Sequence, residues 1–160
     1  MNSKDEHKPS AGSEDNNTVQ TPTFDRSVSK VEVTGFEARH YDLLMNLITA
    51  GSYPVFIRWV VRDMNIKPDD DILILGSGTG RNACLMHRYL SDEGSILGLD
   101  IGDEMLAQAQ QRCHSKQNVT FEKRRIDEPL FHSEAYDKVF MSFVMHGFVQ
   151  EEREGIIQNA

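Results

Sequence analysis

Three glycines that alternate with small hydroxyl residues form the stretch of this chain best suited to bind a ligand. The stretch reads Gly76-Ser77-Gly78-Thr79-Gly80, and its side chains are so small that a ligand can approach the backbone closely. The residues after it suit a helix, so backbone N–H groups and the N-terminus of that helix would point at one spot. The sequence therefore predicts a site for an anionic or polar group at this turn. A tight turn without a ligand is the alternative.

A carboxylate follows at the distance that one strand–helix–strand step requires. Asp100 comes directly after the apolar run 95–99, which we predict to be a strand. A carboxylate at the tip of such a strand can accept hydrogen bonds from two ribose hydroxyls. The alternative is a cap or first-turn acid for the next helix, because Asp103 and Glu104 follow. We favour the ribose role.

The elements that must position these residues are those of an α/β fold. Ile72, Leu73, Ile74 and Leu75 form a short apolar run, which is typical of a strand buried on both faces of a parallel sheet. Strands and helices then alternate, which predicts a doubly wound sheet. We expect strands at 72–75, 95–99, 118–122 and 136–142, and helices at 36–49, 54–64, 81–90, 102–113 and 151–160.

Length and charge bound the class of protein. A chain of 160 residues has room for one domain, and residues 1–30 are too polar to join a core, so we predict a disordered tail before a domain at 31–160. The net charge is −8 and no basic block stands out, so nucleic acid is not an expected partner. No apolar run approaches the roughly 20 residues of a membrane helix, and the start lacks an apolar signal core. We expect a cytoplasmic protein.

The cysteines and histidines predict no metal site. Cys84 and Cys113 are the only cysteines, and free thiols in a reducing compartment are favoured over a disulfide. The six histidines are scattered and make no metal-type spacing with cysteine or paired carboxylates.

The glycine spacing distinguishes between two classes of nucleotide ligand. A dinucleotide fingerprint, G-x-G-x-x-G, would place its third glycine where Arg81 stands, which disfavours a nicotinamide-dependent oxidoreductase. The turn resembles instead motif I of the class I S-adenosylmethionine (SAM) dependent methyltransferases, G-x-G-x-G after an apolar strand. That resemblance implies that the methionine end of SAM lies on the loop, with Asp100 on the ribose and Ile101 on the adenine face.

A second resemblance lies before the first strand. Ala38-Arg39-His40-Tyr41-Asp42, followed by Met45-Asn46 and Gly51, looks like the N-terminal helix of the methyltransferases of ubiquinone and menaquinone biosynthesis. In that family the helix closes over cofactor or substrate. An amphipathic helix that covers the sheet is the alternative for the same residues.

The resemblance also implies further site residues after the third and fourth strands. Ile126 and Asp127 would meet the adenine, although counting back from Tyr136-Asp137 places the family's acid on Arg125. Ser142 lies at the tip of the fourth strand, where substrate and methyl group meet. His146 could serve as a general base, but a histidine without a catalytic purpose is favoured.

Two departures from the family pattern stand out. The family's acid two residues before the first glycine is replaced by Ile74, so the methionine amine would be held less firmly. Only four strands, in the order 3-2-1-4, precede the end of the chain, so the sheet is truncated before the family's last three strands. The fourth strand, 138–142, would then be an exposed edge that invites self-association.

The resemblance, together with the glycine turn and Asp100, implies a SAM-dependent methyltransferase, or the N-terminal half of one, acting on a small-molecule acceptor. A non-catalytic SAM-binding or interaction module made from a half domain is the alternative.

Overall fold

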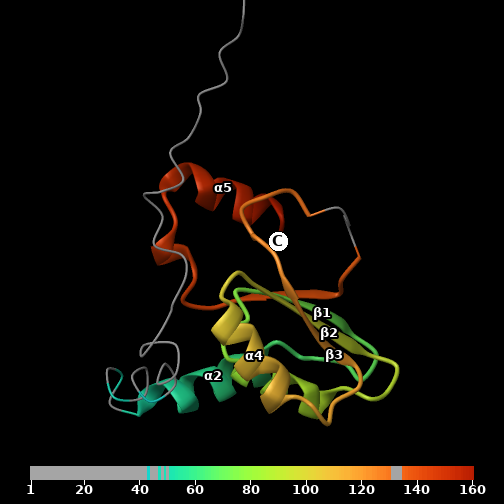
Figure 1. Ribbon diagram of the computed structural model, residues 1–160. Helices are drawn as coiled ribbons and strands as arrows, with labels where there is room; N and C mark the ends of the chain where they lie inside the picture. Colours follow the sequence, from blue (N-terminus) through green and yellow to red (C-terminus); the bar gives the residue numbers. More distant parts are fainter. Residues whose placement is uncertain (1–42, 44–46, 48, 50, 131–134) are drawn as a thin grey trace, which may run out of the picture.

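A four-stranded parallel sheet lies at the centre of the computed structural model, which describes residues 43, 47, 49, 51–130 and 135–160 (Figure 1). The strands stand in the order β3-β2-β1-β4. Their bounds are β1 Asp71–Leu75, β2 Ser95–Asp100, β3 Val119–Lys123 and β4 Lys138–Met141. The predicted fold class and strand order are confirmed.

The register brings the carboxyl ends of the strands to one edge of the sheet. Leu75, the last residue of β1, pairs with Leu99 on one side and with Met141 on the other. Asp100, the last residue of β2, pairs with Lys123 at the end of β3. Because ligands of open parallel sheets bind at this edge, the turn after β1 and the segments after β2, β3 and β4 are placed to share one site.

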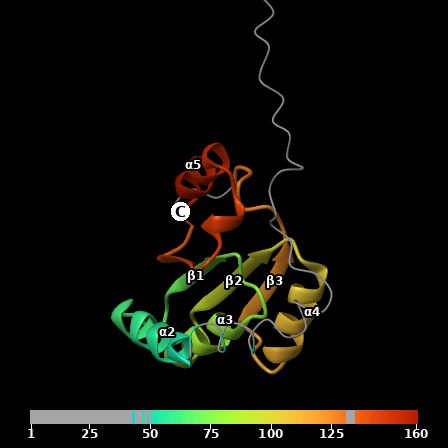
Figure 2. The same cartoon turned by 90° about the vertical axis from the view of Figure 1, so that its left-hand side faces the viewer.

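Helices cover both faces of the sheet. The helices are α2 Ser52–Asp63, α3 Arg81–Met86, α4 Asp103–Arg112 and α5 Gln150–Gln158, with 3₁₀ turns η2 His87–Tyr89 and η3 Met145–Gly147. Figures 1 and 2 show α2, α3 and α4 together on one side of the sheet, with α5 on the opposite side. The sequence predicts one helix over 81–90. In the structure this segment forms α3 followed by the tighter 3₁₀ turn η2.

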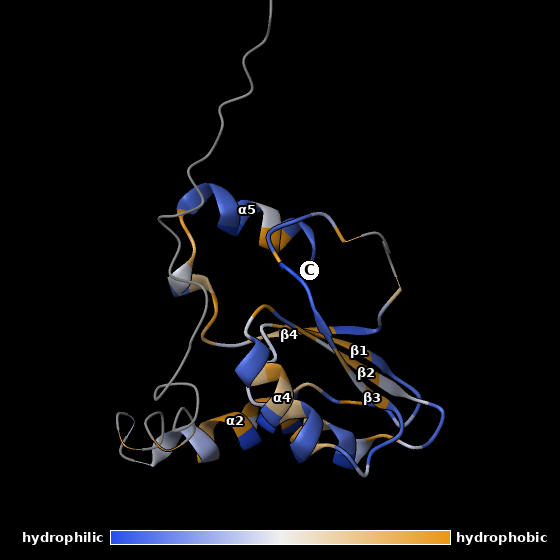
Figure 3. Cartoon of the chain, viewed as in Figure 1, coloured by the Kyte–Doolittle hydropathy of each residue, from blue (hydrophilic) through white to orange (hydrophobic). Residues whose placement is uncertain are grey.

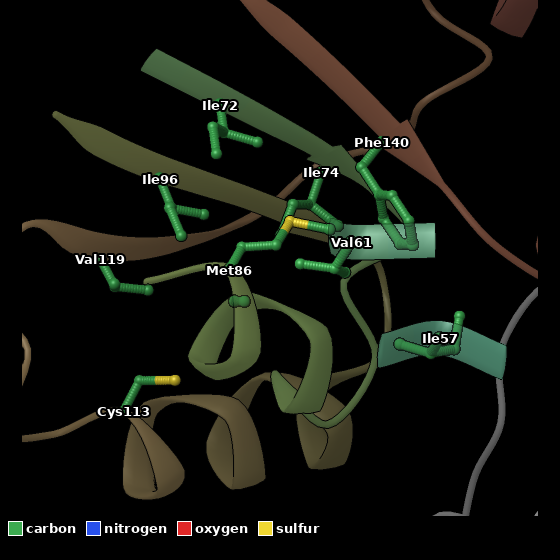
Figure 4. Packing of buried hydrophobic residues seen from close by; sticks show 10 residues of the cluster. Ile57, Val61, Ile72, Ile74, Met86, Ile96, Cys113, Val119 and Phe140 are labelled. Carbon is green, nitrogen blue, oxygen red and sulfur yellow. The ribbon is translucent and has the colours of Figure 1, made fainter. Parts of the chain in front are cut away.

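The apolar side chains of β1 alternate between two hydrophobic cores, one on each face of the sheet. Ile72 and Ile74 point into a cluster with residues of α2 and α3 and with Cys113, directly after α4, which Figure 4 shows from close by. Leu73 and Leu75 point the other way, into a cluster with Ile156 of α5. Side chains of a strand alternate between faces, so a strand covered on both sides must be apolar throughout. Figure 3 shows this apolar character along β1.

Helix α5 braces the loops at the carboxyl edge. The guanidinium Nε of Arg153 donates to the carbonyls of Met145 and Phe148, both at 2.9 Å. The side-chain amide of Asn159 donates to the carbonyls of Ile126 and Glu128, at 2.7 and 2.8 Å. The segments after β3 and β4 are therefore held by one helix, although they are far apart in sequence.

The predicted free thiols are wrong. Cys84 of α3 and Cys113, directly after α4, form a disulfide, with their Cα atoms 6.1 Å apart. Sequence separation hid the pairing, because only the packing of α3 beside α4 brings the two positions together. Disulfides persist mainly in oxidising compartments, so the cytoplasmic location stays a prediction that the pairing does not support.

Several other predictions fall outside the described residues. The tail at 1–30 and almost all of the helix at 36–49, including the stretch that resembles the N-terminal helix of quinone methyltransferases, lie there. Within the described part of the chain, no helix is long and apolar enough to cross a membrane. In that same part, β4 pairs only with β1, while Phe140 is buried in the core and Val139 and Met141 are half-buried.

Candidate cofactor site

The glycine turn is tied to the end of the neighbouring strand. The N–H groups of Gly76 and Ser77 both donate to the carbonyl of Leu99, at 2.9 and 2.8 Å. The turn closes on itself through the N–H of Gly80, which donates to the carbonyl of Ser77 at 3.1 Å. Gly76, Gly78 and Gly80 have φ of 74°, 53° and 72°. Residues with side chains rarely adopt these values, so the turn depends on glycine.

Asp100 joins the glycine turn to the segment after β2. Its Oδ2 accepts the N–H of Gly78 at 2.7 Å, and its Oδ1 accepts the N–H of Gly102 at 2.9 Å. A carboxylate oxygen can accept more than one hydrogen bond, so both oxygens keep capacity for hydroxyl donors. The half-buried side chain therefore positions the turn and still faces the site.

A pocket at the carboxyl edge collects nearly all of the site residues that the sequence predicts. Those that line it are Gly76, Ser77, Gly78, Thr79, Asp100, Ile101, Ile126, Asp127, Ser142 and His146. Gly80 is the exception. It lies against α4, where an added Cβ would come within 2.8 Å of the Cα of Ala109. Its role in this structure is close helix packing.

Two buried polar atoms in the pocket have no hydrogen-bond partner. They are Oγ of Ser77 and Oδ1 of Asn82, and both residues line the pocket. Buried polar groups are nearly always hydrogen-bonded in folded proteins. Two such atoms in residues that line one cavity leave hydrogen-bonding capacity for a polar ligand there. The amide of Asn82 is already oriented, because its Nδ2 donates to the hydroxyl of Tyr53 at 3.3 Å.

Asp127 is bound by a neighbouring side chain. Arg125 donates from Nε to Oδ1 at 3.0 Å and from Nη2 to Oδ2 at 2.8 Å, a bidentate pair. The Asp127 side chain is only 4% exposed, and its hydrogen bond is the main reason that the pKa of Arg125 is raised, outweighing the opposing effect of burial. Counting back from Tyr136-Asp137 assigns the family's acid to position 125. This chain has Arg125 there, and Arg125 orients the acid Asp127 two residues later.

Aromatic residues near the pocket were missed by the sequence analysis. Phe143, directly after the tip of β4, is half exposed and has a φ of 57°, which is rare for a bulky residue. Its ring meets that of Tyr53 edge-to-face at 5.4 Å between centroids, and the guanidinium of Arg81 lies 5.4 Å from the Tyr53 centroid. All three residues line the pocket. No local pattern signals them, because Tyr53 comes from α2 and only the fold brings it here.

His146 lies in η3 and is exposed. The carbonyls of Met145 and Phe148 on either side of it are fixed by Arg153, so its backbone is positioned, and the exposed residue lines the pocket. Ile74, at the place of the family's acid, is 1% exposed in the core and does not line the pocket. In the described part of the chain, no group of three or more histidines, cysteines and acids gathers as a metal site requires.

The known proteins that this chain resembles are methyltransferases. Residues 72–160 match the family described as "Methyltransferase domain". The chain is 25% identical over 147 residues to the ubiquinone/menaquinone biosynthesis C-methyltransferase UbiE of Vibrio campbellii, covering 87% of this chain and 57% of that protein. It is 27% identical over 124 residues to UbiE of Xanthomonas oryzae pv. oryzae, covering 76% of this chain and 49% of that protein. The chain thus spans about half the length of these relatives.

Solved structures show the same fold. A SAM-dependent methyltransferase from Aquifex aeolicus superimposes with a TM-score of 0.56 at 19% identity, over 65% of this chain and 57% of that one. Another, from Geobacter sulfurreducens in complex with S-adenosyl-L-homocysteine, gives a TM-score of 0.55 at 20% identity, over 66% and 43%. At these identities the likeness concerns the fold.

Proposed function

Because the chain belongs to the methyltransferase domain family, we propose that it binds SAM in the pocket around the glycine turn and transfers the methyl group to a small planar acceptor. Membership confirms the resemblance to class I SAM-dependent methyltransferases that the sequence predicts. The observation that carries the proposal is the pair of buried, unpartnered atoms Ser77 Oγ and Asn82 Oδ1, which share one pocket with the carboxylate of Asp100.

The residues present suit the parts of such a cofactor. Asp100 would accept the ribose hydroxyls through the acceptor capacity that its two backbone hydrogen bonds leave. Ile101 and the buried Ile126 offer apolar surface for the adenine. At the methionine end, the carbonyl oxygen of Asn82 would accept the ammonium that an acid at position 74 holds in the family. A neutral acceptor forms a weaker hydrogen bond to a cation than a carboxylate does.

Arg125 and Asp127 would contribute to cofactor binding by fixing the shape of the pocket wall, more than by their charges. Their bidentate pair neutralises both side chains and fixes the backbone from 125 to 127, next to the apolar Ile126. An adenine contact of Asp127 would then use its backbone groups rather than its carboxylate. This is a sharper form of the sequence prediction for that residue.

The acceptor side of the pocket favours a flat, partly apolar molecule. Tyr53 and Phe143 present aromatic rings there, and aromatic rings stack well on planar ligands. The relatives from V. campbellii and X. oryzae carry names in ubiquinone/menaquinone biosynthesis and C-methylation, so a hydroquinone ring is the acceptor class we infer. Methylation at a ring carbon releases a proton, and His146 on the exposed side of the pocket is the side chain best placed to receive it.

The reaction needs few residues. SAM, when bound, supplies a methyl group on a sulfonium that a nucleophile can attack in line. What the chain must provide is positioning of both partners and exclusion of water. Asp100, Asn82 and the glycine turn would fix the donor, while Tyr53 and Phe143 would orient the acceptor. The braces from Arg153 and Asn159 keep these loops in place.

Calorimetry with S-adenosylhomocysteine tests the binding part of this proposal. Asp100→Ala should weaken the affinity by about 1–3 kcal/mol, since hydrogen bonds to a charged acceptor are lost. Asp103→Ala is the matched control, because that exposed carboxylate pairs with Lys123 and does not line the pocket. Equal affinities of the two variants would remove Asp100 from the site.

Transfer of labelled methyl from SAM to a soluble hydroquinone tests the catalytic part. Activity that falls in Phe143→Ala while cofactor affinity is unchanged would support the acceptor assignment. Binding without any transfer would leave the non-catalytic alternative as the better description of this chain.

A further inference from the structure

The disulfide between α3 and the end of α4 lies against the glycine turn. Both of its cysteines meet one atom of that turn, the carbonyl oxygen of Gly80. This oxygen accepts the N–H of Cys84 at 3.0 Å, and Sγ of Cys113 lies 3.7 Å from it. The last residue of the turn is therefore in direct contact with the bond that joins the two helices.

Gly80 is enclosed so closely that it must follow a movement of these helices. An added Cβ at Gly80 would come within 2.8 Å of the Cα of Ala109 in α4. Its N–H donates to the carbonyl of Ser77 at 3.1 Å, the hydrogen bond that closes the turn. Protein interiors packed at this density transmit a displacement rather than absorb it. A shift of α4 relative to α3 would thus reach the glycine turn through Gly80.

Helix α4 is bound to the cofactor pocket, the pocket at the carboxyl edge, from both of its ends. At its last turn, Arg112 donates from Nη1 to Oγ1 of Thr79 at 2.9 Å, and Thr79 lines the pocket. Directly before its first turn, the N–H of Gly102 donates to Oδ1 of Asp100, whose Oδ2 accepts an N–H of the glycine turn. The position of α4 therefore affects the turn and the carboxylate together.

The two sulfurs of the disulfide differ in their access to solvent. Cys113 is 3% exposed and belongs to the core cluster that Figure 4 shows. Cys84 is half-buried and lines a hollow of about 400 Å³, whose walls include Pro54 and Arg58 of α2. Thiol–disulfide exchange requires that an attacking thiolate reach one sulfur of the bond. A small dithiol can attack Cys84 from this hollow.

We propose that the Cys84–Cys113 disulfide is a redox switch that sets the affinity of the cofactor pocket, an inference that rests on the proposed binding of SAM. A thiolate of the dithiol forms a mixed disulfide with Cys84, and Cys113 leaves as a thiolate. The second thiol of the reductant then displaces Cys84. The reductant ends as a disulfide, the protein bond is reduced by two electrons, and the two protons of the dithiol end on the two cysteines.

Reduction should loosen the turn while the domain stays folded. Two thiols do not remain at bonding distance, so the sulfurs move apart, and α3 and α4 lose their covalent link. Because Gly80 touches both cysteines and Ala109, this movement disturbs the turn and the amides beside Asp100. The disulfide form should therefore bind the cofactor more tightly, and bound cofactor should favour the disulfide by the same factor.

Calorimetry with S-adenosylhomocysteine on the 160-residue chain, oxidised or reduced with dithiothreitol, tests the switch. We expect reduction to weaken the affinity about fivefold or more, the lower range of coupling between sites. Cys84→Ala/Cys113→Ala has no bond to reduce, so its affinity should be low with and without reductant. Equal affinities of the oxidised and reduced wild-type chain would overturn the proposal.

A variant that is destabilised elsewhere separates the switch from a general loss of stability. Ile72 is fully buried in the same core cluster, at the amino end of β1 and away from the carboxyl edge. Ile72→Ala should unfold at lower urea concentration, yet in its oxidised form it should keep the wild-type affinity and lose it on reduction. If oxidised Ile72→Ala binds as weakly as the reduced wild-type chain, general destabilisation explains the effect and the proposal is wrong.

Hydrogen exchange followed by mass spectrometry tests the switch without any cofactor. The N–H groups of Gly76, Ser77, Gly78 and Gly80 are all hydrogen-bonded in the disulfide form. Reduction should speed exchange at 76–80 severalfold more than in β1, and an unchanged rate at 76–80 would overturn the proposal even where the double cysteine variant fails to fold. Absence of S-adenosylhomocysteine binding to the oxidised chain would instead refute the proposed function, and exchange would still decide whether the turn responds to reduction.

A redox titration supplies the reciprocal measurement. Saturating S-adenosylhomocysteine should make the midpoint potential of the cysteine pair more negative, by about 30 mV for a tenfold difference in affinity between the two forms. Thiol labelling of Cys84 and Cys113 in dithiothreitol buffers of graded ratio measures that midpoint. An unchanged midpoint in the presence of bound S-adenosylhomocysteine would contradict the switch.

Discussion

Alanine substitutions at Gly78 and Gly80 should separate the two functions of the glycine turn. Both residues have positive φ, 53° and 72°. An added Cβ at Gly78 meets no atom within 4 Å, whereas at Gly80 it meets the Cα of Ala109 at 2.8 Å and its Cβ at 2.9 Å. Both alanine substitutions therefore carry the cost of a left-handed backbone conformation. Only Gly80→Ala adds a steric clash with α4.

The expected losses in the free energy of unfolding follow from the backbone cost and the steric cost. The left-handed conformation costs an alanine about 1–2 kcal/mol, and the loss of glycine's freedom in the unfolded chain returns about 0.4–1 kcal/mol. Gly78→Ala should thus lower the free energy of unfolding by about 1 kcal/mol. Gly80→Ala adds overpacking against the backbone of α4, typically about 1–3 kcal/mol, for a total of about 2–4 kcal/mol.

Urea unfolding followed by circular dichroism measures these costs, and calorimetry with S-adenosylhomocysteine measures the effect on the site. Gly78→Ala places a methyl group in open space beside Asp100, so its cofactor affinity should fall although the fold is kept. Equal unfolding free energies for the two variants would refute the packing argument. An unchanged cofactor affinity of Gly78→Ala would refute the placement of the ligand over that residue.

Three other outcomes can be measured on the same chain. Reduction of the Cys84–Cys113 disulfide, which closes a sequence separation of 29 residues, should lower the free energy of unfolding by about 3–4 kcal/mol, and thiol titration should find reactive cysteine only after reductant is added. Arg125→Gln should cost about 1–3 kcal/mol in urea unfolding because the buried Asp127 carboxylate loses its partner, and Arg125→Gln/Asp127→Asn should recover part of that loss. Light scattering at rising concentration should show self-association through the outer edge of β4, and a monomer at all concentrations would refute that prediction.

The parts of the fold that were predicted from sequence are those that depend on local pattern. The apolar run 72–75 predicts a strand covered on both faces, and the strand–helix–strand spacing predicts Asp100 at the tip of the next strand, as β1 and β2 show. The glycine turn was predicted from three glycines that alternate with small residues, and the positive φ of all three in the structure agrees with that prediction. The family resemblance, rather than local pattern, placed Ser142 and His146 near the tip of the fourth strand, and both line the pocket.

Contacts between distant elements could not be predicted in this way. The pairing of Cys84 with Cys113 depends on how α3 packs beside α4, and no periodicity encodes that distance. Tyr53 reaches the pocket from α2, which precedes the glycine turn in the chain.

The glycine turn shows why a motif can be recognised without its residues being assigned correctly. The three glycines look equivalent in the sequence, and we expected all of them to contact the cofactor. In the fold, Gly76 and Gly78 line the pocket, while Gly80 lies on the opposite side of the turn, against Ala109 of α4. Its carbonyl also accepts the N–H of Cys84, the hydrogen bond that begins α3. One glycine spacing therefore encodes two requirements, room for a ligand at Gly76 and Gly78 and room for helix α4 at Gly80.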